Sequence, residues 1–245
     1  MLIRENCGGA YFGKKVEEPD YGLDPWEYHR YEIERVARVA GALAMQHDPP
    51  LNVWSVDKAN VLASSRVWRR IVHEIFEKEF PKVNLRDQLA DSLAMMLITK
   101  PTAFNGVIVT DNTFGDILSD ESGGLTGSLG LLPSASLAGA PHGDLGRNKA
   151  GGVVGLYEPV HGSAPDISGK GLANPVAQIL SLAMMLRYSF NLTREADIVE
   201  QAVEKVLNSK ADGGLEIRTG DLGGKAGTRE MSDAIQGEVR RLLSV

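Results

Sequence analysis

The sequence predicts an α/β protein with two domains, and two patterns in the chain support this prediction. Up to about residue 125, short β-branched or apolar segments alternate with segments of helical periodicity, which is typical of a parallel sheet covered by helices. After Gly123 the chain becomes rich in glycine and then in helices, with few strands between them. We therefore expect one domain over residues 1–125 and a second over residues 126–245.

The predicted strands are short, apolar and followed by turn or helix-start residues. They are Leu2–Arg4, Asn52–Asp57, Lys82–Leu85, Gly106–Thr110 and Gly155–Glu158. Gly8–Gly13 predicts a tight turn that enters a further short strand. Lys14–Tyr28 is polar, contains two prolines and predicts an irregular arm.

The predicted helices carry apolar residues three or four positions apart. They are Tyr31–His47, Ser64–Phe80, Asp87–Thr99, Phe114–Ser122, Asn174–Phe190, Glu195–Asn208 and Ser232–Leu243. Ser64 or Ser65, Asn174 and Ser232 are the expected N-caps, and Pro175 suits the first helical position. Gly123–Gly139 is interpreted as a linker, and Pro141–Gly152 as a polar loop of unassigned role.

The composition is that of an ordinary globular protein. Hydrophobic residues make up 43% and charged residues 24% of the 245 residues, a balance that supports packed cores. The net charge of -6, without a long basic run, argues against nucleic-acid binding. The single cysteine, Cys7, excludes an intrachain disulfide and fits a reducing, cytoplasmic compartment. Neither a signal-peptide core nor a membrane-spanning run is present, so no membrane partner is expected.

The stretch DNTFGDILSD contains the strongest candidate for a metal site. Asp116 and Asp120 are four residues apart just after the strand Gly106–Thr110, so on a helix they share one face. Two carboxylates in that arrangement repel each other unless a cation lies between them, and Mg²⁺ or Mn²⁺ prefers such oxygen ligands. With Asp91, in QLADSLAMML, they form a possible three-carboxylate site. The alternative is a solvated acidic helix face.

Four further side chains are candidates for chemistry at strand ends. Lys58, in VDKANVL, suits a general base or a charge clamp, and Asn60 suits a hydrogen bond to a ligand. Arg4 suits bidentate binding of a substrate carboxylate, and Tyr11 suits proton donation. The alternatives are a surface lysine, a turn asparagine and a packed tyrosine.

The loop EPVHGSAPDISGKGLANP follows a strand and is a candidate nucleotide-binding loop. Gly162 and Ser163 allow backbone N–H groups to face phosphate oxygens. Asp166 suits the two ribose hydroxyls of an adenosine and repels a 2′-phosphate, which favours NAD over NADP. No GxGxxG follows a strand, so an ordinary structured loop is the alternative.

Long motifs occur in one order along nearly the whole chain and carry a family resemblance. They are IRENCGGAYFGK, SVDKANVLASSRVWRR, LADSLAMML, TDNTFGDILSDESGGLTGSLGLLPSASLAG and YEPVHGSAPDISGKGLANPVAQILSLAMML. The chain resembles the metal-dependent β-decarboxylating dehydrogenases of the isocitrate/isopropylmalate dehydrogenase family, and the wording is nearest to fungal members that oxidise isopropylmalate. The resemblance implies NAD-dependent oxidative decarboxylation of 3-isopropylmalate to 2-oxoisocaproate, a step of leucine biosynthesis.

The resemblance also implies roles for the candidate residues. Asp91, Asp116 and Asp120 match ligands of Mg²⁺ or Mn²⁺, and Lys58 and Tyr11 match the residues that move protons. Arg4, Asn60 and Val61 match substrate-binding positions. The positions that match Lys58, Asn60 and Asp91 reach into the neighbouring subunit's site, which implies a homodimer with shared active sites. The positions that match the NAD-binding loop are Glu158, His161, Gly162, Ser163, Ala164, Asp166, Ile167 and Asn174.

The chain departs from the family at its N-terminus, where members carry a longer segment. We therefore expect a two-domain fold of the isopropylmalate dehydrogenase type in which the first part of the cofactor domain is missing. Residues 1–125 correspond to the smaller, dimer-forming domain, and residues 126–245 to the C-terminal part of the NAD-binding domain. The alternatives are a related 2-hydroxy-acid oxidative decarboxylase, acting on tartrate or homoisocitrate, and a truncated, non-catalytic dimerisation chain.

Overall fold

A computed structural model describes residues 1–141, 143–149 and 151–244, and its chain divides into two compact units. Unit 1 comprises Met1–Leu125 with Ala140–Gly143, and unit 2 comprises Thr126–Gly139 with Asp144–Val245. The assignment of dimer formation to residues 1–125 and of NAD binding to residues 126–245 stays a prediction.

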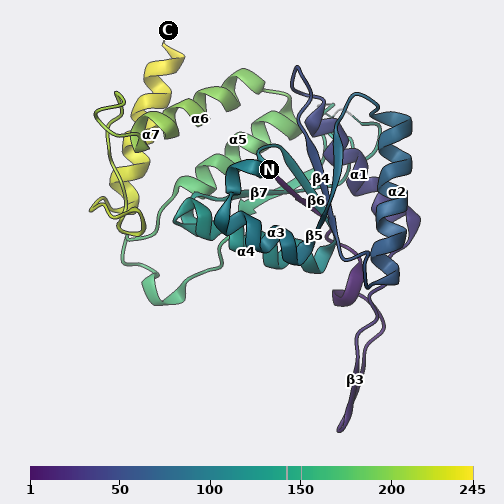
Figure 1. The fold of residues 1–245 in the computed structure, drawn as a ribbon. Helices are drawn as coiled ribbons and strands as arrows, with labels where there is room; N and C mark the ends of the chain where they lie inside the picture. Colours follow the sequence, from purple (N-terminus) through teal and green to yellow (C-terminus); the bar gives the residue numbers. More distant parts are fainter. Residues whose placement is uncertain (142, 150, 245) are drawn as a thin grey trace. The chain divides into compact units, whose positions relative to one another are not determined.

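Unit 1 is built on a four-stranded sheet in the order β1-β6-β4-β5 (Figure 1). The strands are β1 (Leu2–Arg4), β6 (Val107–Thr110), β4 (Val53–Asp57) and β5 (Leu85–Leu89). Every neighbouring pair is parallel, so the carboxyl ends of all four strands meet at one edge of the sheet. This parallel sheet with its helices confirms the predicted α/β class.

Helices cover both faces of this sheet (Figure 1). They are α1 (Arg30–Ala44), α2 (Ala63–Glu79), α3 (Ala90–Thr99) and α4 (Asn112–Thr126). Alternate strand residues point to opposite faces, so β4 buries Val53 with α1 and α2, and Trp54 with α3. By the same alternation on β6, Val109 lies in the core with α1 and α2, and Ile108 lies in the core with α3. The sheet is therefore the middle layer of three.

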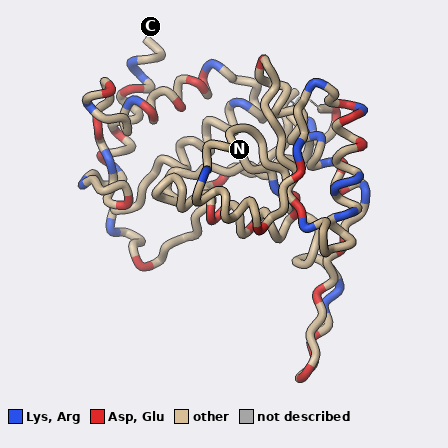
Figure 2. Tube along the Cα trace, viewed as in Figure 1, with Lys and Arg blue, Asp and Glu red and all other residues tan. Residues whose placement is uncertain are grey.

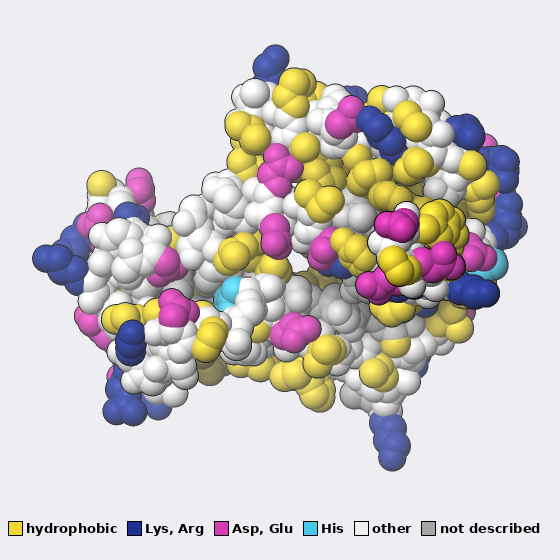
Figure 3. Space-filling view, turned by 90° about the horizontal axis from the view of Figure 1, so that it is seen from below, with side chains coloured by type: hydrophobic (Ala, Val, Ile, Leu, Met, Phe, Trp, Pro, Cys, Tyr) yellow, Lys and Arg dark blue, Asp and Glu magenta, His cyan; other side chains and the backbone are white. Residues whose placement is uncertain are grey.

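A hairpin leaves the carboxyl edge of the sheet after β1. The short 3₁₀ helix η1 (Gly9–Tyr11) leads into β2 (Val16–Glu18) and β3 (Tyr21–Leu23), which pair antiparallel and project from unit 1 (Figure 1). Hydrophobic and acidic side chains occur together on the face from which this arm projects (Figure 3). The turn predicted at Gly8–Gly13 is present as η1, which leads into the short strand β2, whereas the irregular arm predicted over Lys14–Tyr28 was wrong because that segment contains a hairpin.

Unit 2 contains a two-stranded antiparallel sheet and three helices. The strands are β7 (Pro133–Leu137) and β8 (Gly155–Pro159), and the helices are α5 (Val176–Phe190), α6 (Thr193–Leu207) and α7 (Thr228–Leu243). α5 packs against both strands and α6, and α6 packs against α7. Val206 of α6 and Met231 of α7 lie fully buried in their shared core.

Several predicted boundaries were wrong. β5 begins at Leu85 rather than at residue 82, and α7 begins at Thr228, so Ser232 lies inside it and donates to the Thr228 carbonyl over 2.8 Å. Residues 123–139 are no linker, because they contain the end of α4, the 3₁₀ helix η3 (Leu129–Leu131) and β7. The predicted loop at residues 141–152 includes His142 and Ala150, which lie outside the described residues.

The outer surface of α1 and α2 is densely charged (Figure 2). Arg30 of α1 pairs with Glu74 of α2 over 2.8 Å, and Arg38 pairs with Glu79 over 2.9 Å. Among the residues that the structure describes, no helix is both long and apolar enough to cross a lipid bilayer.

Candidate functional site

Three of the predicted site residues meet in one group at the carboxyl ends of β1 and β6, here called the Arg4 cluster (Arg4, Tyr11, Asn112 and Asp116). Arg4 Nη1 lies 2.5 Å from Asp116 Oδ1, and the Tyr11 hydroxyl donates to Asp116 Oδ2 over 3.0 Å. Asn112 Oδ1 accepts from both Nε (2.9 Å) and Nη2 (2.8 Å) of Arg4. These contacts fix the orientation of the Arg4 guanidinium at the start of α4.

A glycine on α4 makes room for this arrangement. Arg4 pairs in register with Thr110 of β6, just before α4 begins. The stem of Arg4 then crosses Gly115, where an added Cβ would lie 2.7 Å from Arg4 Cγ. Because carbon atoms do not approach this closely, a side chain at position 115 would displace Arg4.

The turn that brings Tyr11 to the cluster is fastened to a buried carboxylate. Glu5 accepts hydrogen bonds from the backbone N–H groups of Cys7 (2.9 Å) and Gly8 (2.7 Å) and from Arg35 Nη2 (2.6 Å). Its side chain is fully buried, so these bonds compensate for the loss of water. Glu5 therefore fixes the backbone between β1 and η1.

Asp116 and Asp120 lie one helical turn apart on α4, as the spacing predicted. Asp120 is exposed, and the Asp116 side chain is 48% exposed, so both carboxylates are accessible. No group of three His, Cys, Asp or Glu residues in the described part of the chain lies close enough to hold a metal ion. One chain therefore supplies two of the three predicted ligands, and Asp91 does not join them.

Asp91 belongs instead to a second group, the Lys58 cluster (Lys58, Asn60, Val61 and Asp91), at the ends of β4 and β5. Lys58 Nζ lies 2.7 Å from Asp91 Oδ2. The Lys58 side chain is 25% exposed and that of Asp91 is 66% exposed. Asn60 and Val61 are exposed on the turn that follows β4. This cluster faces solvent at the same edge of the sheet as the Arg4 cluster.

The turn that carries Lys58 is rigidly supported. Asp57, at the end of β4, is buried and accepts from Nε (2.9 Å) and Nη2 (2.8 Å) of Arg69 on α2. Its Oδ1 also accepts from the N–H of Ala59 over 2.8 Å. Arg66 donates to the Val61 carbonyl over 3.1 Å, so the turn is tied to α2 at both ends.

Two pKa shifts bear on proton transfer. Partial burial of the ring, together with the hydrogen bond to Asp116 and the charge of that carboxylate, raises the pKa of Tyr11, so its phenol keeps its proton at neutral pH. The hydrogen bond from Lys58 lowers the pKa of Asp91 and keeps that carboxylate charged. The two clusters thus offer a proton donor and a lysine beside a charged carboxylate.

The predicted NAD-binding loop lies in unit 2, after β8. Ala164 has a left-handed backbone with φ of 41°, and the 3₁₀ helix η4 (Pro165–Ile167) follows it. Within the residues described, the backbone N–H groups of Gly162, Ser163 and Ala164 donate to no protein acceptor. Three neighbouring open donors ahead of the exposed Asp166 carboxylate fit a ligand with phosphate and ribose groups. His161 Nδ1 lies 2.8 Å from the Gly162 carbonyl oxygen.

The far end of the loop is held by a carboxylate that the sequence did not indicate. Asn174 Oδ1 accepts from the N–H of Val176 at the start of α5, and its Nδ2 donates to Asp221 Oδ2 over 3.0 Å. The same carboxylate oxygen accepts from Ser128 Oγ over 2.5 Å. Asp221 thus joins three distant segments of unit 2 and fixes the predicted NAD-binding residue Asn174.

The sequence also missed the supporting role of three residues in unit 1. Asn112 was interpreted as helix-start chemistry, and Gly115 and Glu5 were not singled out. A glycine inside a predicted helix, between Phe114 and Asp116 in TFGDIL, was an available signal for close approach of another group. Glu5 carried no such signal, because its partner Arg35 is thirty residues away along the chain.

Comparisons with known proteins show the family of this chain. The family model described as "Isocitrate/isopropylmalate dehydrogenase" matches residues 1–235. A "3-isopropylmalate dehydrogenase" of Hapsidospora chrysogena is 62% identical over 241 residues, which cover 96% of this chain and 62% of the relative. The enzyme of the same name from Saccharomyces cerevisiae is 51% identical, with 100% and 64% covered.

A solved structure is also similar. The "isocitrate dehydrogenase from Methylococcus capsulatus" superposes with a TM-score of 0.81 at 36% identity, covering 98% of this chain and 66% of that one. The chain spans about three fifths of the length of the curated relatives it matches, 62% of the first and 61% of an Aspergillus niger "3-isopropylmalate dehydrogenase B". The chain belongs to the isocitrate/isopropylmalate dehydrogenase family.

Proposed function

We propose that this chain serves the NAD-dependent oxidative decarboxylation of 3-isopropylmalate to 2-oxoisocaproate in leucine biosynthesis. One observation carries the proposal: Arg4, Tyr11 and Asp116 on one side, and Lys58 and Asp91 on the other, gather at a single edge of the parallel sheet. The names of the curated relatives support this choice of substrate. We also expect the protein in the cytoplasm, which cell fractionation tests.

The chemistry follows from the side chains. The Arg4 guanidinium, oriented by Asn112, holds a carboxylate of the substrate. Lys58, in its neutral amine form, takes the proton of the C2 hydroxyl, and after the β-carboxylate leaves as carbon dioxide, Tyr11 gives its proton to the enol carbon. A bound NAD would supply the hydride acceptor for C2, and a divalent cation held by the carboxylates would supply stabilisation of negative charge on the substrate.

The residues fit a divalent cation, with one ligand from a second chain. Asp116 and Asp120 provide accessible carboxylate oxygens from one turn of α4. Mg²⁺ and Mn²⁺ accept a few carboxylates, with water or substrate oxygens completing the coordination. We assign the third carboxylate to Asp91 of the partner subunit, because within the described residues of one chain Asp91 does not lie with Asp116 and Asp120.

Exposed features of unit 1 support a homodimer with shared sites. The hydrophobic side chains of Met95, Ile98 and Ile117 lie exposed on α3 and α4. An isolated two-stranded hairpin such as the β2–β3 arm is marginally stable in water, so a partner surface would stabilise it. In an isologous dimer, each Arg4 cluster faces the Lys58 cluster of the other chain, which produces two equivalent sites.

Steady-state NADH formation by the purified protein with Mg²⁺ tests the proposal. We expect the highest kcat/KM with 3-isopropylmalate, lower values with tartrate and homoisocitrate, and the lowest with isocitrate. A higher value for isocitrate than for 3-isopropylmalate contradicts the choice of substrate. A dimer by light scattering that forms no NADH from any of the four acids contradicts the enzymatic proposal and supports a dimerisation chain.

A further inference from the structure

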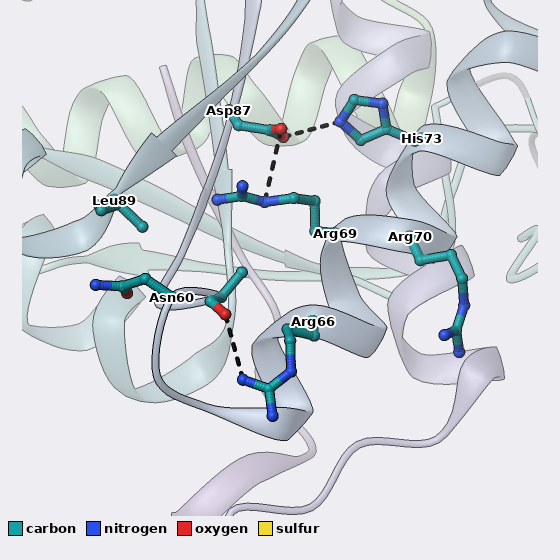
Figure 4. A pocket seen from close by; sticks show the side chains of 8 residues that line it. Asn60, Arg66, Arg69, Arg70, His73, Asp87 and Leu89 are labelled. Atoms are coloured by element: carbon teal, nitrogen blue, oxygen red, sulfur yellow. Dashed lines mark hydrogen bonds and ion pairs between the residues drawn. The ribbon is translucent and has the colours of Figure 1, made fainter.

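An open surface hollow of about 690 Å³ lies in unit 1 between the ends of β4 and β5 and the first half of α2 (Figure 4). We call it the arginine pocket; its lining residues are Ala59, Asn60, Arg66, Arg69, Arg70, His73, Asp87 and Leu89. The lining therefore contains three arginines and a histidine but a single carboxylate. A volume of this size suits an organic molecule rather than a lone inorganic ion.

The carboxylate of the pocket is already engaged. Asp87 Oδ1 lies 2.9 Å from His73 Nε2, and Asp87 Oδ2 lies 3.6 Å from Arg69 Nε (Figure 4). Arg69 in turn makes its bidentate contact with the buried Asp57 behind the pocket. The inner wall is thus a fixed network in which Asp57 pairs with Arg69, and Asp87 pairs with Arg69 and His73.

The two outer arginines have spare donors. Arg66 uses only Nη1, which donates to the carbonyl oxygens of Ala59 (3.3 Å) and Val61 (3.1 Å). Among the residues described, it pairs with no carboxylate. Arg70 has a single distant contact, 3.9 Å to Glu74, whose other oxygen is 2.8 Å from Arg30. Arg66 and Arg70 are four residues apart, on one face of α2.

We propose that the arginine pocket binds a small organic dianion of the dicarboxylate or phosphomonoester class. The free N–H groups of Arg66 and Arg70 bind its oxygens, because guanidinium groups match carboxylate and phosphate geometry. Leu89 and Ala59 contact the carbon skeleton. The site lies beside the Lys58 turn and is separate from the Arg4 cluster.

Titration calorimetry on the whole chain, without NAD or metal, tests this site with succinate, glycerol 3-phosphate and the monoanion acetate. We expect one dianion per chain and at least about tenfold weaker binding of acetate, since acetate lacks the second anionic group and loses its charge-assisted hydrogen bonds. Preference for succinate identifies a dicarboxylate site, and preference for glycerol 3-phosphate identifies a phosphomonoester site. Absence of binding of both at millimolar concentration overturns the proposal.

Two variants locate the binding. The double variant Arg66→Gln, Arg70→Gln should bind at least about tenfold more weakly, since both forks are lost. The control Arg194→Gln, Arg240→Gln removes the same charge from exposed positions in unit 2 and should bind within about twofold of the unaltered chain. Equal losses in both double variants contradict a specific site. Because Arg4 also suits carboxylates, the variant Arg4→Gln should retain dianion binding, and its loss contradicts the assignment.

Chemical protection on the unaltered chain removes any dependence on variant folding. Phenylglyoxal modifies accessible guanidinium groups, and mass spectrometry measures each arginine separately. Saturating dianion should slow modification of Arg66 and Arg70 and leave Arg194 unchanged. Unchanged rates at Arg66 and Arg70 overturn the proposal. None of these measurements requires turnover, so their failure is distinguishable from failure of the dehydrogenase proposal.

Discussion

Asp111, between β6 and α4, is a buried carboxylate whose titration should appear in the stability of unit 1. It is 5% exposed and accepts from the N–H of Phe114 and the indole of Trp26, each over 2.9 Å. Burial raises its pKa to about 6, and the charges of Glu5 and Asp57 add to the increase, although the two hydrogen bonds oppose it.

The sign of the effect follows from linkage. An unfolded chain releases the Asp111 proton near pH 3.9, whereas the folded chain releases it near pH 6. Between these values the folded state binds more protons, so this group's contribution to stability is complete below pH 4 and is lost as the pH rises through 6. A shift of about two units corresponds to about 3 kcal/mol.

The variant Asp111→Asn removes the titration while it keeps one acceptor. The difference in unfolding free energy, variant minus unaltered chain, should rise by about 3 kcal/mol between pH 4 and pH 7. The hydrogen bond that asparagine loses lowers the unfolding free energy of the variant by the same amount at every pH, so it does not alter the change between pH 4 and pH 7. Urea unfolding followed by tryptophan fluorescence reports on unit 1, because Trp26, Trp54 and Trp68 all lie there.

The matched control is Asp20→Asn, which alters an exposed carboxylate at the tip of the arm. Its difference from the unaltered chain should stay within about 0.5 kcal/mol across the same pH range. A flat difference for Asp111→Asn, parallel to that of the control, would refute the assignment of a raised pKa to this burial.

Two further predictions concern the supports of the Arg4 cluster. Gly115→Ala should displace Arg4 and raise the KM for the hydroxy acid by about tenfold, with little change in the KM for NAD. The control is Gly124→Ala on the same helix, where no atom lies within 4 Å of the added carbon, and it should leave both KM values unchanged. An unchanged KM at position 115 contradicts the steric argument. Glu5→Ala should destabilise unit 1 by about 3 kcal/mol in urea, because buried N–H groups and Arg35 lose their acceptor; a loss below about 1 kcal/mol contradicts it.

The sequence predicted the α/β class and the helix with Asp116 and Asp120, because those features rest on local periodicity. It failed at β5, where Arg86–Asp87–Gln88 interrupts the apolar pattern. β5 is an edge strand with two exposed central residues, so one side of it tolerates charge, and Asp87 pairs across to His73 on α2.

The β2–β3 arm was missed for a related reason. Its residues face solvent in the described chain, so no alternation of apolar and polar positions marks the strands. The separation of Lys58 and Asp91 from Asp116 was also beyond local patterns, since it depends on the strand order β1-β6-β4-β5. Roles that depend on a second chain or on bound NAD stay predictions.

Mn²⁺ binding by mixed dimers tests the shared-site account most directly. Asp116→Asn removes a ligand from the Arg4 cluster, and Asp91→Asn removes the ligand that the other chain supplies, so each variant alone should bind Mn²⁺ weakly by electron paramagnetic resonance. After dissociation and reassociation at equal amounts, half the dimers are mixed and each has one intact site, which should restore about a quarter of the tight sites. Tight binding by Asp91→Asn alone, or none in the mixture, would contradict the account.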